Sequence, residues 1–112
     1  MISIVIPTFN EVENIVPLLK KLTLILNDFE YEIVVVDDDS PDGTSEEVNK
    51  YMNVNKRVKL ITRIGRSGLS SAIKEGLIFA KGKYLLVLDG DGQHHPSFIL
   101  NMLGEIQRNK SD

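Results

Sequence analysis

Four short apolar segments, each followed by a segment with helical spacing of apolar residues, constrain the fold of this sequence more than any other feature. Strands are predicted over residues 2–6, 31–36, 58–61 and 84–88. Helices are predicted over residues 11–26, over a short segment that ends at about residue 52, from residue 67 or 70 to 80, and from residue 96 onward. Strands that alternate with helices pair in parallel through right-handed crossovers. The sequence therefore predicts an α/β fold, with a mainly parallel sheet of about four strands and helices on both faces.

Three residues are predicted to mark element boundaries. Pro7 follows a β-branched run and should end the first strand. Asn10 precedes two glutamates and suits the N-cap of the first helix, and Gly82 should close the third helix.

Composition limits the class of protein. With 112 residues, the chain suits one domain with one core, so a single domain over residues 1–112 is expected. Apolar residues make up 42% and charged residues 26%, as in ordinary globular proteins. The net charge of −3 predicts no broad basic face for a nucleic acid, and no cysteine is present for disulfides or thiolate metal sites. No apolar run approaches the roughly 18 residues of a membrane helix, and no secretory signal is evident, so a cytoplasmic protein is expected.

Polar clusters follow the first, second and fourth predicted strands. Ligands of parallel α/β sheets bind at the carboxyl ends of the strands. We therefore expect three distant segments of the chain to meet at one rim of the sheet.

Asp89 and Asp91 are the main candidates for a metal site. They lie two residues apart at the end of an apolar strand, so in extended geometry their side chains point the same way. Two carboxylates at such a short distance repel each other unless a divalent cation lies between them. Oxygen ligands favour Mg²⁺ or Mn²⁺. Gly90 and Gly92 would let the backbone turn tightly, and Gln93 offers a third oxygen ligand. A solvated acidic turn that caps the last helix is the alternative.

Asp37, Asp38 and Asp39 follow the second strand directly. Three adjacent carboxylates repel one another without an evident benefit to folding, which favours a functional role. One of them would accept hydrogen bonds from a base N–H or a ribose hydroxyl, and another would face the metal. Asp42 and Thr44, further along the same turn, are interpreted as structural.

Arg63 and Arg66 lie in a glycine-containing loop just before a helix. Cations at this position suit a diphosphate or an acceptor phosphate, whereas a solvated basic loop is the alternative. His94 and His95 are interpreted as helix-cap or acceptor-side residues, because hard cations prefer oxygen ligands.

Together these motifs resemble the inverting glycosyltransferases with the GT-A fold, over essentially the whole chain. The segments that carry the resemblance are Ile6 to Glu11 (IPTFNE), Val36 to Thr44 (VDDDSPDGT), Arg63 to Leu69 with Ala72 and Gly76, and Leu88 to Pro96 (LDGDGQHHP). The sequence Ser-Pro-Asp-Gly-Thr and the last two segments are similar to the dolichol- and polyprenyl-phosphate mannosyl- or glucosyltransferases. Gly90 stands where that subgroup more often has alanine, and Asp39 where it more often has glycine or asparagine.

The resemblance implies the Rossmann-like, nucleotide-sugar-binding N-terminal half of such an enzyme. The donor would be a nucleotide sugar such as GDP-mannose or UDP-glucose, and the acceptor a dolichyl or polyprenyl phosphate or a glycan. Asp89 and Asp91 would be the catalytic residues, because with Gln93 they would hold Mg²⁺ or Mn²⁺ on the diphosphate that an acceptor oxygen displaces with inversion. The residues that would bind substrate are Pro7, Thr8, Asn10, Glu11, Asp37, Asp38, Asp39, Arg63 and Arg66.

The resemblance also implies further strands beyond residue 112, so we expect a chain shortened at its C-terminus that transfers little sugar by itself. The full-length protein would work at the cytoplasmic face of a membrane. The fourth strand is expected beside the first with its outer edge bare, which predicts a homo-oligomer formed through that edge.

A response-regulator receiver domain is the main alternative from another class, since it has this size and clustered aspartates. A receiver carries its acidic pair after the first strand, whereas Pro7 and Thr8 occupy that position here. A dinucleotide-binding domain is disfavoured because the glycines do not form G-x-G-x-x-G after the first strand. A non-catalytic nucleotide-binding module on the same fold is the third alternative.

Overall fold

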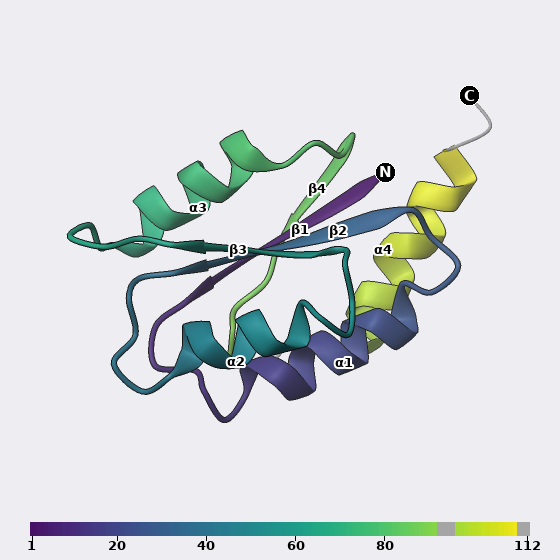
Figure 1. The fold of residues 1–112 in the computed structure, drawn as a ribbon. Coiled ribbons are helices and arrows are strands. Elements are labelled where there is room, and N and C mark those ends of the chain that lie inside the picture. Colours follow the sequence, from purple (N-terminus) through teal and green to yellow (C-terminus); the bar gives the residue numbers. More distant parts are fainter. Residues whose placement is uncertain (92–95, 110–112) are drawn as a thin grey trace.

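The computed structural model describes residues 1–91 and 96–109, and its strands and helices alternate as the sequence predicts. The elements are β1 (Ile2–Thr8), α1 (Ile15–Ile25), β2 (Tyr31–Asp37), α2 (Thr44–Tyr51), β3 (Val58–Thr62), α3 (Leu69–Phe79), β4 (Tyr84–Val87) and α4 (Pro96–Asn109). Within these residues the strands are parallel and lie in the order β3-β2-β1-β4 (Figure 1). The α/β fold is confirmed, including the expected place of β4 beside β1.

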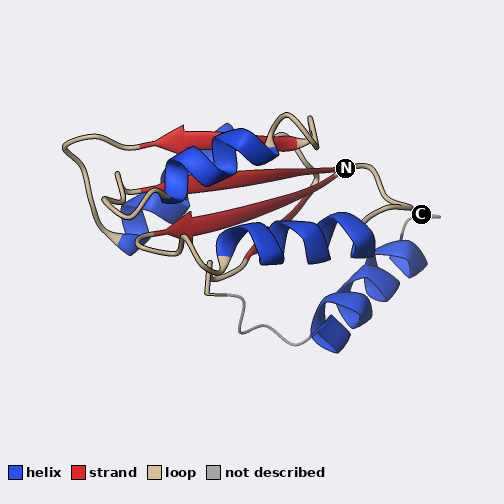
Figure 2. Ribbon diagram, turned by 60° about the horizontal axis from the view of Figure 1, so that its bottom comes forward, coloured by secondary structure: helices blue, strands red, loops and turns tan. Residues whose placement is uncertain are grey.

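Alternating side chains divide the core into two layers. Ile4 and Ile6 of β1 pack with α1, α2 and α4, whereas Val5 packs against α3. Helices therefore cover both faces of the sheet, as predicted (Figures 1 and 2). Burial on both faces explains why β1 and β2 are almost continuously apolar in sequence. No helix in the described ranges is long and apolar enough to cross a membrane.

The expectation that Pro7 ends the first strand is wrong, because β1 continues through it. The Val5 carbonyl accepts a hydrogen bond from the Leu88 N–H on the β4 side, and the Thr8 carbonyl accepts one from the Asp38 N–H on the β2 side. The N–H and C=O groups of successive residues point to opposite sides of a strand. Pro7 lies two residues after Val5 and one before Thr8, so its backbone groups point to the β4 side. β4 pairs with β1 only as far as Val5, so the missing N–H of proline removes no bond of the sheet.

Asn10 is not the N-cap of α1, which begins four residues later than predicted. Asn14 takes the cap position, and the N–H groups of Asn14 and Ile15 donate to the Glu11 carbonyl at 3.0 and 2.9 Å. Asn10 itself has a φ of 57°, in the left-handed region that asparagine tolerates better than most residues. Its N–H donates to Ser40 Oγ at 2.8 Å, so this residue begins a loop rather than a helix.

α3 lies close to the sheet at Gly76. A Cβ at this position would come within 2.5 Å of Val5 Cγ1 and 3.0 Å of Val36 Cγ2, so the spacing requires glycine. Gly82, which was expected to close α3, lies beyond the end of the helix. Its N–H donates to Ser3 Oγ at 2.7 Å and joins the chain after α3 to β1.

Candidate functional site

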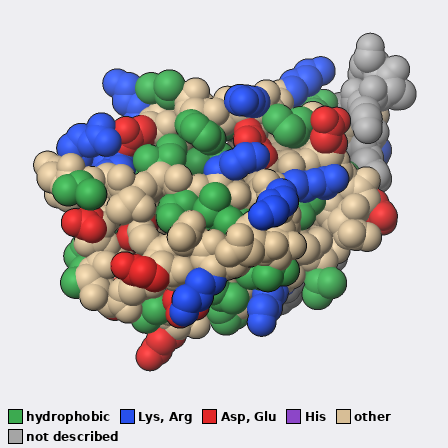
Figure 3. All heavy atoms as spheres, viewed as in Figure 1, with side chains coloured by type: hydrophobic (Ala, Val, Ile, Leu, Met, Phe, Trp, Pro, Cys, Tyr) green, Lys and Arg blue, Asp and Glu red, His purple; other side chains and the backbone are tan. Residues whose placement is uncertain are grey.

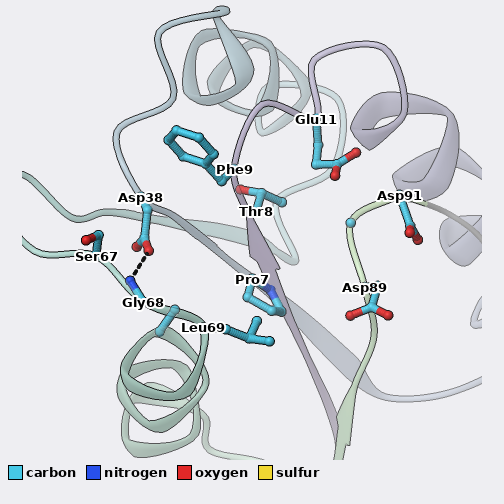
Figure 4. A pocket seen from close by; sticks show the side chains of 12 residues that line it. Pro7, Thr8, Phe9, Glu11, Asp38, Ser67, Gly68, Leu69, Asp89 and Asp91 are labelled. Carbon is cyan, nitrogen blue, oxygen red and sulfur yellow. Dashed lines mark hydrogen bonds between the residues drawn. The ribbon is translucent and has the colours of Figure 1, made fainter.

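A cavity of about 560 Å³ lies at the carboxyl ends of β1, β2 and β4, beside the first turn of α3. Its lining residues are Pro7, Thr8, Phe9, Glu11, Asp38, Ser67, Gly68, Leu69, Ala72, Asp89, Gly90 and Asp91. Figure 4 shows Asp38 and Gly68 on one side of the end of β1, and Asp89 and Asp91 on the other. The segments after the first, second and fourth strands thus meet at one rim, as their order in the sequence predicts.

The structure brings some of the predicted site residues to this cavity and leaves others out. Those that line it are Pro7, Thr8, Glu11, Asp38, Asp89 and Asp91. Those that do not are Asn10, Asp37, Asp39, Arg63 and Arg66. Gln93, predicted as a metal ligand, lies outside the described residues, as do His94 and His95.

Six residues outside the predicted set also line the cavity: Phe9, Ser67, Gly68, Leu69, Ala72 and Gly90. Ser67, Gly68, Leu69 and Ala72 lie at or just before the first turn of α3. Two sequence signals point to these four residues. The glycine-containing loop lies directly before that helix, and the N-terminus of a helix after a strand faces the ligand rim. The segment from Arg63 to Leu69, with Ala72, also carries part of the family resemblance.

Side chains of the second loop hold the first loop in place. The N–H groups of residues 10, 11 and 12 donate to Ser40 Oγ, Thr44 Oγ1 and Asp42 Oδ2 at 2.8, 3.0 and 3.2 Å. The N–H of Val12 and the backbone and hydroxyl of Thr44 outweigh desolvation and lower the pKa of Asp42. The interpretation of Asp42 and Thr44 as structural is supported, and Ser40 shares that role.

Asp37 is fully buried and is also part of this framework. Its carboxylate accepts hydrogen bonds from Thr8 Oγ1 at 2.8 Å, from the N–H and Oγ of Ser40 at 3.0 and 2.6 Å, and from Ser45 Oγ at 2.7 Å. The expectation that the three adjacent aspartates bring no benefit to folding is therefore wrong for Asp37. Asp39 is exposed and has a φ of 55°, so only Asp38 of the three faces the cavity.

Asp38 is held on both carboxylate oxygens. Arg63 Nε donates to Oδ1 at 2.7 Å, and the Gly68 N–H donates to Oδ2 at 3.0 Å. Arg63 also donates to Ser71 Oγ at 2.9 Å and to Glu75 Oε2 at 3.4 Å. One buried guanidinium thus joins the end of β2 to the start of α3 beside the cavity.

The alternative of a solvated basic loop is therefore wrong for Arg63, whose side chain is 2% exposed. The hydrogen bond to Asp38 outweighs burial and raises the pKa of Arg63 above its ordinary value. Arg66 is 62% exposed, and its Nη1 lies 2.9 Å from Glu75 Oε1. Neither arginine is among the residues that line the cavity.

Asp89 and Asp91 supply the carboxylate pair of the cavity (Figure 4). Gly90 between them lies against β1, because a Cβ there would come within 2.8 Å of Thr8 Cγ2 and 3.3 Å of the Pro7 carbonyl oxygen. Close approach of two segments, rather than a tight turn around a metal, explains this glycine. In the described part of the chain, no three Asp, Glu or His side chains converge to hold a metal ion.

Comparison with solved structures defines the class of protein. The fold is similar to that of a mannosyltransferase from Pyrobaculum calidifontis in complex with GDP-Man and Mn²⁺, with a TM-score of 0.70 and 26% identity. That similarity covers 80% of this chain and 27% of the other. The chain thus has the Rossmann-like α/β arrangement of GT-A nucleotide-sugar transferases, as predicted.

Residues 3–112 match the family described as Glycosyl transferase family 2, and the chain belongs to that family. The receiver-domain and dinucleotide-binding alternatives are thereby excluded. The chain is 42% identical over 111 residues to a dolichol-phosphate mannosyltransferase of Pyrococcus furiosus, and 37% identical over 100 residues to that of Saccharomyces cerevisiae. These matches cover 99% and 87% of this chain, but only 31% and 38% of the relatives, so the chain spans about a third of their length.

Proposed function

We propose that residues 1–112 form the nucleotide-sugar-binding part of a hexosyltransferase. It would bind a nucleotide sugar of the GDP-mannose or UDP-glucose type with a divalent metal, and transfer the hexose with inversion to an acceptor such as dolichyl or polyprenyl phosphate or a glycan. The observation that carries this proposal is the meeting of a carboxylate pair with the ends of β1 and β2 at one cavity. The names of the curated relatives and the GDP-Man and Mn²⁺ of the similar solved structure support it.

Asp89 and Asp91 are the residues that we assign to Mg²⁺ or Mn²⁺. Two carboxylates supply the hard oxygen donors that these cations prefer, and water and donor phosphates complete the usual coordination. When bound, the cation would supply Lewis-acid stabilisation of charge on the leaving diphosphate. Gln93 is proposed as a third ligand on the basis of the sequence alone.

Asp38 and Phe9 are the residues that we assign to the nucleoside. Asp38 lies on the opposite side of the cavity from the acidic pair, so a donor with its diphosphate at Asp89 and Asp91 would extend its base and ribose toward Asp38 (Figure 4). Phe9 lines the cavity and is 56% exposed, which leaves its ring available to stack on a base. Pro7, Thr8 and Glu11 would line the space between.

The acceptor must approach the anomeric carbon from the side opposite the diphosphate, to within about 3 to 3.5 Å. A lipid phosphate carries its own anionic oxygen nucleophile, so this acceptor needs no protein base. A lipid phosphate acceptor would also place the full-length protein at the cytoplasmic face of a membrane. A glycan hydroxyl would need a base from this chain or from the further length that the relatives have.

Calorimetric titration of GDP-mannose, UDP-glucose and UDP-GlcNAc, with Mn²⁺ and with EDTA, tests donor binding. We expect one donor to bind about tenfold or more tightly in Mn²⁺, a difference of at least about 1.4 kcal/mol. Asp89→Asn should abolish that metal dependence, whereas Asp28→Asn, at an exposed carboxylate in the turn after α1, should leave it intact. No binding of any donor would overturn the proposed function, and unchanged metal-dependent binding in Asp89→Asn would overturn the metal assignment alone.

Transfer of labelled mannose from GDP-mannose to a polyprenyl phosphate separates an enzyme from a non-catalytic nucleotide-binding module. The assay uses this chain and also a longer protein, in which this chain is followed by the remaining part of a relative's sequence. Transfer in the longer protein that Asp91→Asn abolishes would support the proposal. Donor binding without transfer in either protein would favour the non-catalytic module.

We also propose a homo-oligomer formed through β4. Among the described strands, β4 pairs only with β1 and so forms one edge of the sheet. Leu85 and Val87 of β4 are 49% and 39% exposed. An apolar strand edge pairs readily with another chain, and a two-fold pairing of identical edges would close after two copies.

A further inference from the structure

The ionisable residues are divided unevenly along the chain. Residues 48–88 contain nine lysines and arginines and a single acidic residue, Glu75. Residues 1–47 contain eleven acidic residues and two lysines. In the fold, residues 48–88 form the end of α2, β3, α3, β4 and their connecting loops. The net charge of −3 therefore averages a basic part and an acidic part of the chain.

The same basic part exposes large apolar side chains. Ile64 in the β3–α3 loop is 75% exposed, and Ile78 on α3 is 77% exposed. In Figure 1 the β3–α3 loop projects beyond the sheet beside the start of α3. Figure 3 shows basic and hydrophobic side chains interleaved over the α3 side of the face in view.

A groove of about 510 Å³ lies along α3 beside the cavity described above, and Ile78 is one of its lining residues. It is lined by Arg66, Ser67, Ser71, Lys74 and Ile78, together with the Arg63–Glu75 ion pair. Arg63 forms an ion pair with Asp38, and Glu75 forms ion pairs with both Arg63 and Arg66. Arg66 and the exposed Lys74 are therefore the cations that the groove presents to solvent.

We propose that the outer side of α3 and the β3–α3 loop dock on a bilayer that contains anionic lipids. Arg66 and Lys74 would meet headgroup phosphates, and Ser67 and Ser71 would add hydroxyl donors. Ile64 and Ile78 would enter the boundary between headgroups and acyl chains. A nucleic acid would satisfy the cations but would leave the exposed isoleucines in water, so the combination favours lipid.

Ser67 lines both this groove and the nucleotide cavity, so docking would bring the mouth of the cavity near the bilayer. That consequence rests on the proposed function, because a lipid-linked acceptor would approach from the same side. The docking itself does not depend on nucleotide binding. It is therefore measured without nucleotide, and its failure would leave the calorimetric test of donor binding untouched.

Cosedimentation of the chain with vesicles tests the proposal, using phosphatidylcholine alone and phosphatidylcholine mixed with phosphatidylglycerol. We expect binding to the anionic vesicles only, reduced at high salt because exposed charges are then screened. Each cation near an anionic surface contributes about a fivefold change in partitioning, so Arg66→Gln with Lys74→Gln should lower it by about tenfold or more. Ile64→Ser with Ile78→Ser should lower it as well.

The matched control is Lys20→Gln with Lys21→Gln, which removes two exposed cations from α1 on the opposite face and should change partitioning little. Circular dichroism of each variant verifies that it is folded. Partitioning that falls equally in the α1 control and the α3 variant would overturn the proposal, as would binding that is independent of the anionic lipid. Tighter binding to a DNA duplex than to anionic vesicles would also overturn it and assign the face to nucleic acid.

Discussion

Arg63 joins three segments of the chain through one side chain. Its guanidinium bonds to Asp38 on β2's carboxyl end and to Ser71 and Glu75 on α3. A buried charge is stable only while its partners remain, and the same holds for the carboxylate of Asp38 opposite it. Arg63 is therefore a positioning residue for Asp38 and for the wall of the cavity.

Replacing Arg63 by methionine should destabilise the fold and weaken nucleotide binding, because it leaves the Asp38 carboxylate without its main partner. We expect the midpoint of thermal unfolding to fall by on the order of 10 °C. Arg66→Met, which removes an exposed cation from the same loop, should lower it by less than about 2 °C. Differential scanning calorimetry measures both, and equal midpoints for the two variants would contradict the role assigned to Arg63.

Glu32 is a buried carboxylate at the opposite end of the sheet from the cavity. Its Oε2 accepts hydrogen bonds from Ser3 Oγ and from the Lys81 N–H, each at 2.6 Å. Burial alone would raise the pKa of Glu32, but these bonds and the charges of Lys59 and Lys81 outweigh it and lower the pKa below 4.5. Glu32 fastens the chain after α3 to β1 and β2.

A carboxyl group whose pKa is lowered by folding stabilises the fold above its unfolded pKa, and this contribution is lost as the pH falls through the folded pKa. Glu32→Gln should therefore reduce the free energy of unfolding by about 1 to 2 kcal/mol at neutral pH. The difference from the unsubstituted protein should shrink progressively below pH 4.5. Urea unfolding across this pH range measures it, with Glu30→Gln, at an exposed neighbour, as the control. A difference that is constant with pH would contradict the assignment.

At the scale of elements, the position of α3 depends on Gly76, a residue without a side chain that lies against the sheet. Gly76 lets the helix approach Val5 and Val36 closely, and Leu69 and Ala72 on its first turn then line the cavity. The distance between helix and sheet thus sets the shape of the cavity wall.

Gly76→Ala should therefore push α3 away from the sheet and cost about 1 to 3 kcal/mol of stability, as overpacking of a core does. Gly104→Ala in α4 is the matched control, because a Cβ at residue 104 meets nothing within 4 Å. There the higher helix propensity of alanine should stabilise the protein by up to about 1 kcal/mol. Chemical denaturation measures both, and the same sign of change in the two variants would show that α3 has room at Gly76.

At the scale of the whole molecule, the bare edge of β4 leads to a prediction about assembly. We expect sedimentation velocity to show a concentration-dependent dimer of the 112-residue chain. Leu85→Lys with Val87→Lys should shift it to the monomer, because charged residues on an edge strand oppose pairing. Leu24→Lys, at a residue of α1 that is 79% exposed, should leave the dimer intact. A monomer at every concentration, or a dimer that is insensitive to the β4 variant, would contradict pairing through this edge.

The sequence by itself determined the order of the elements, the parallel sheet and the rim at which the polar segments meet. Those features follow from local periodicity and from the few ways in which alternating strands and helices connect. It also placed Asp89 and Asp91 at that rim, because both residues directly follow the last strand.

Only the tertiary structure decided which members of each polar cluster face the cavity. Asp37 turns into the framework, Asp38 lines the cavity and Asp39 is exposed, although the three are adjacent and chemically identical. Arg63 and Arg66 divide in the same way between buried and exposed. The partners that fix these directions lie far away in sequence, as Thr8 does from Asp37 and Asp38 from Arg63. A buried charge is stable only beside such partners, so its direction is set where distant segments pack together, and no local pattern in the sequence encodes it.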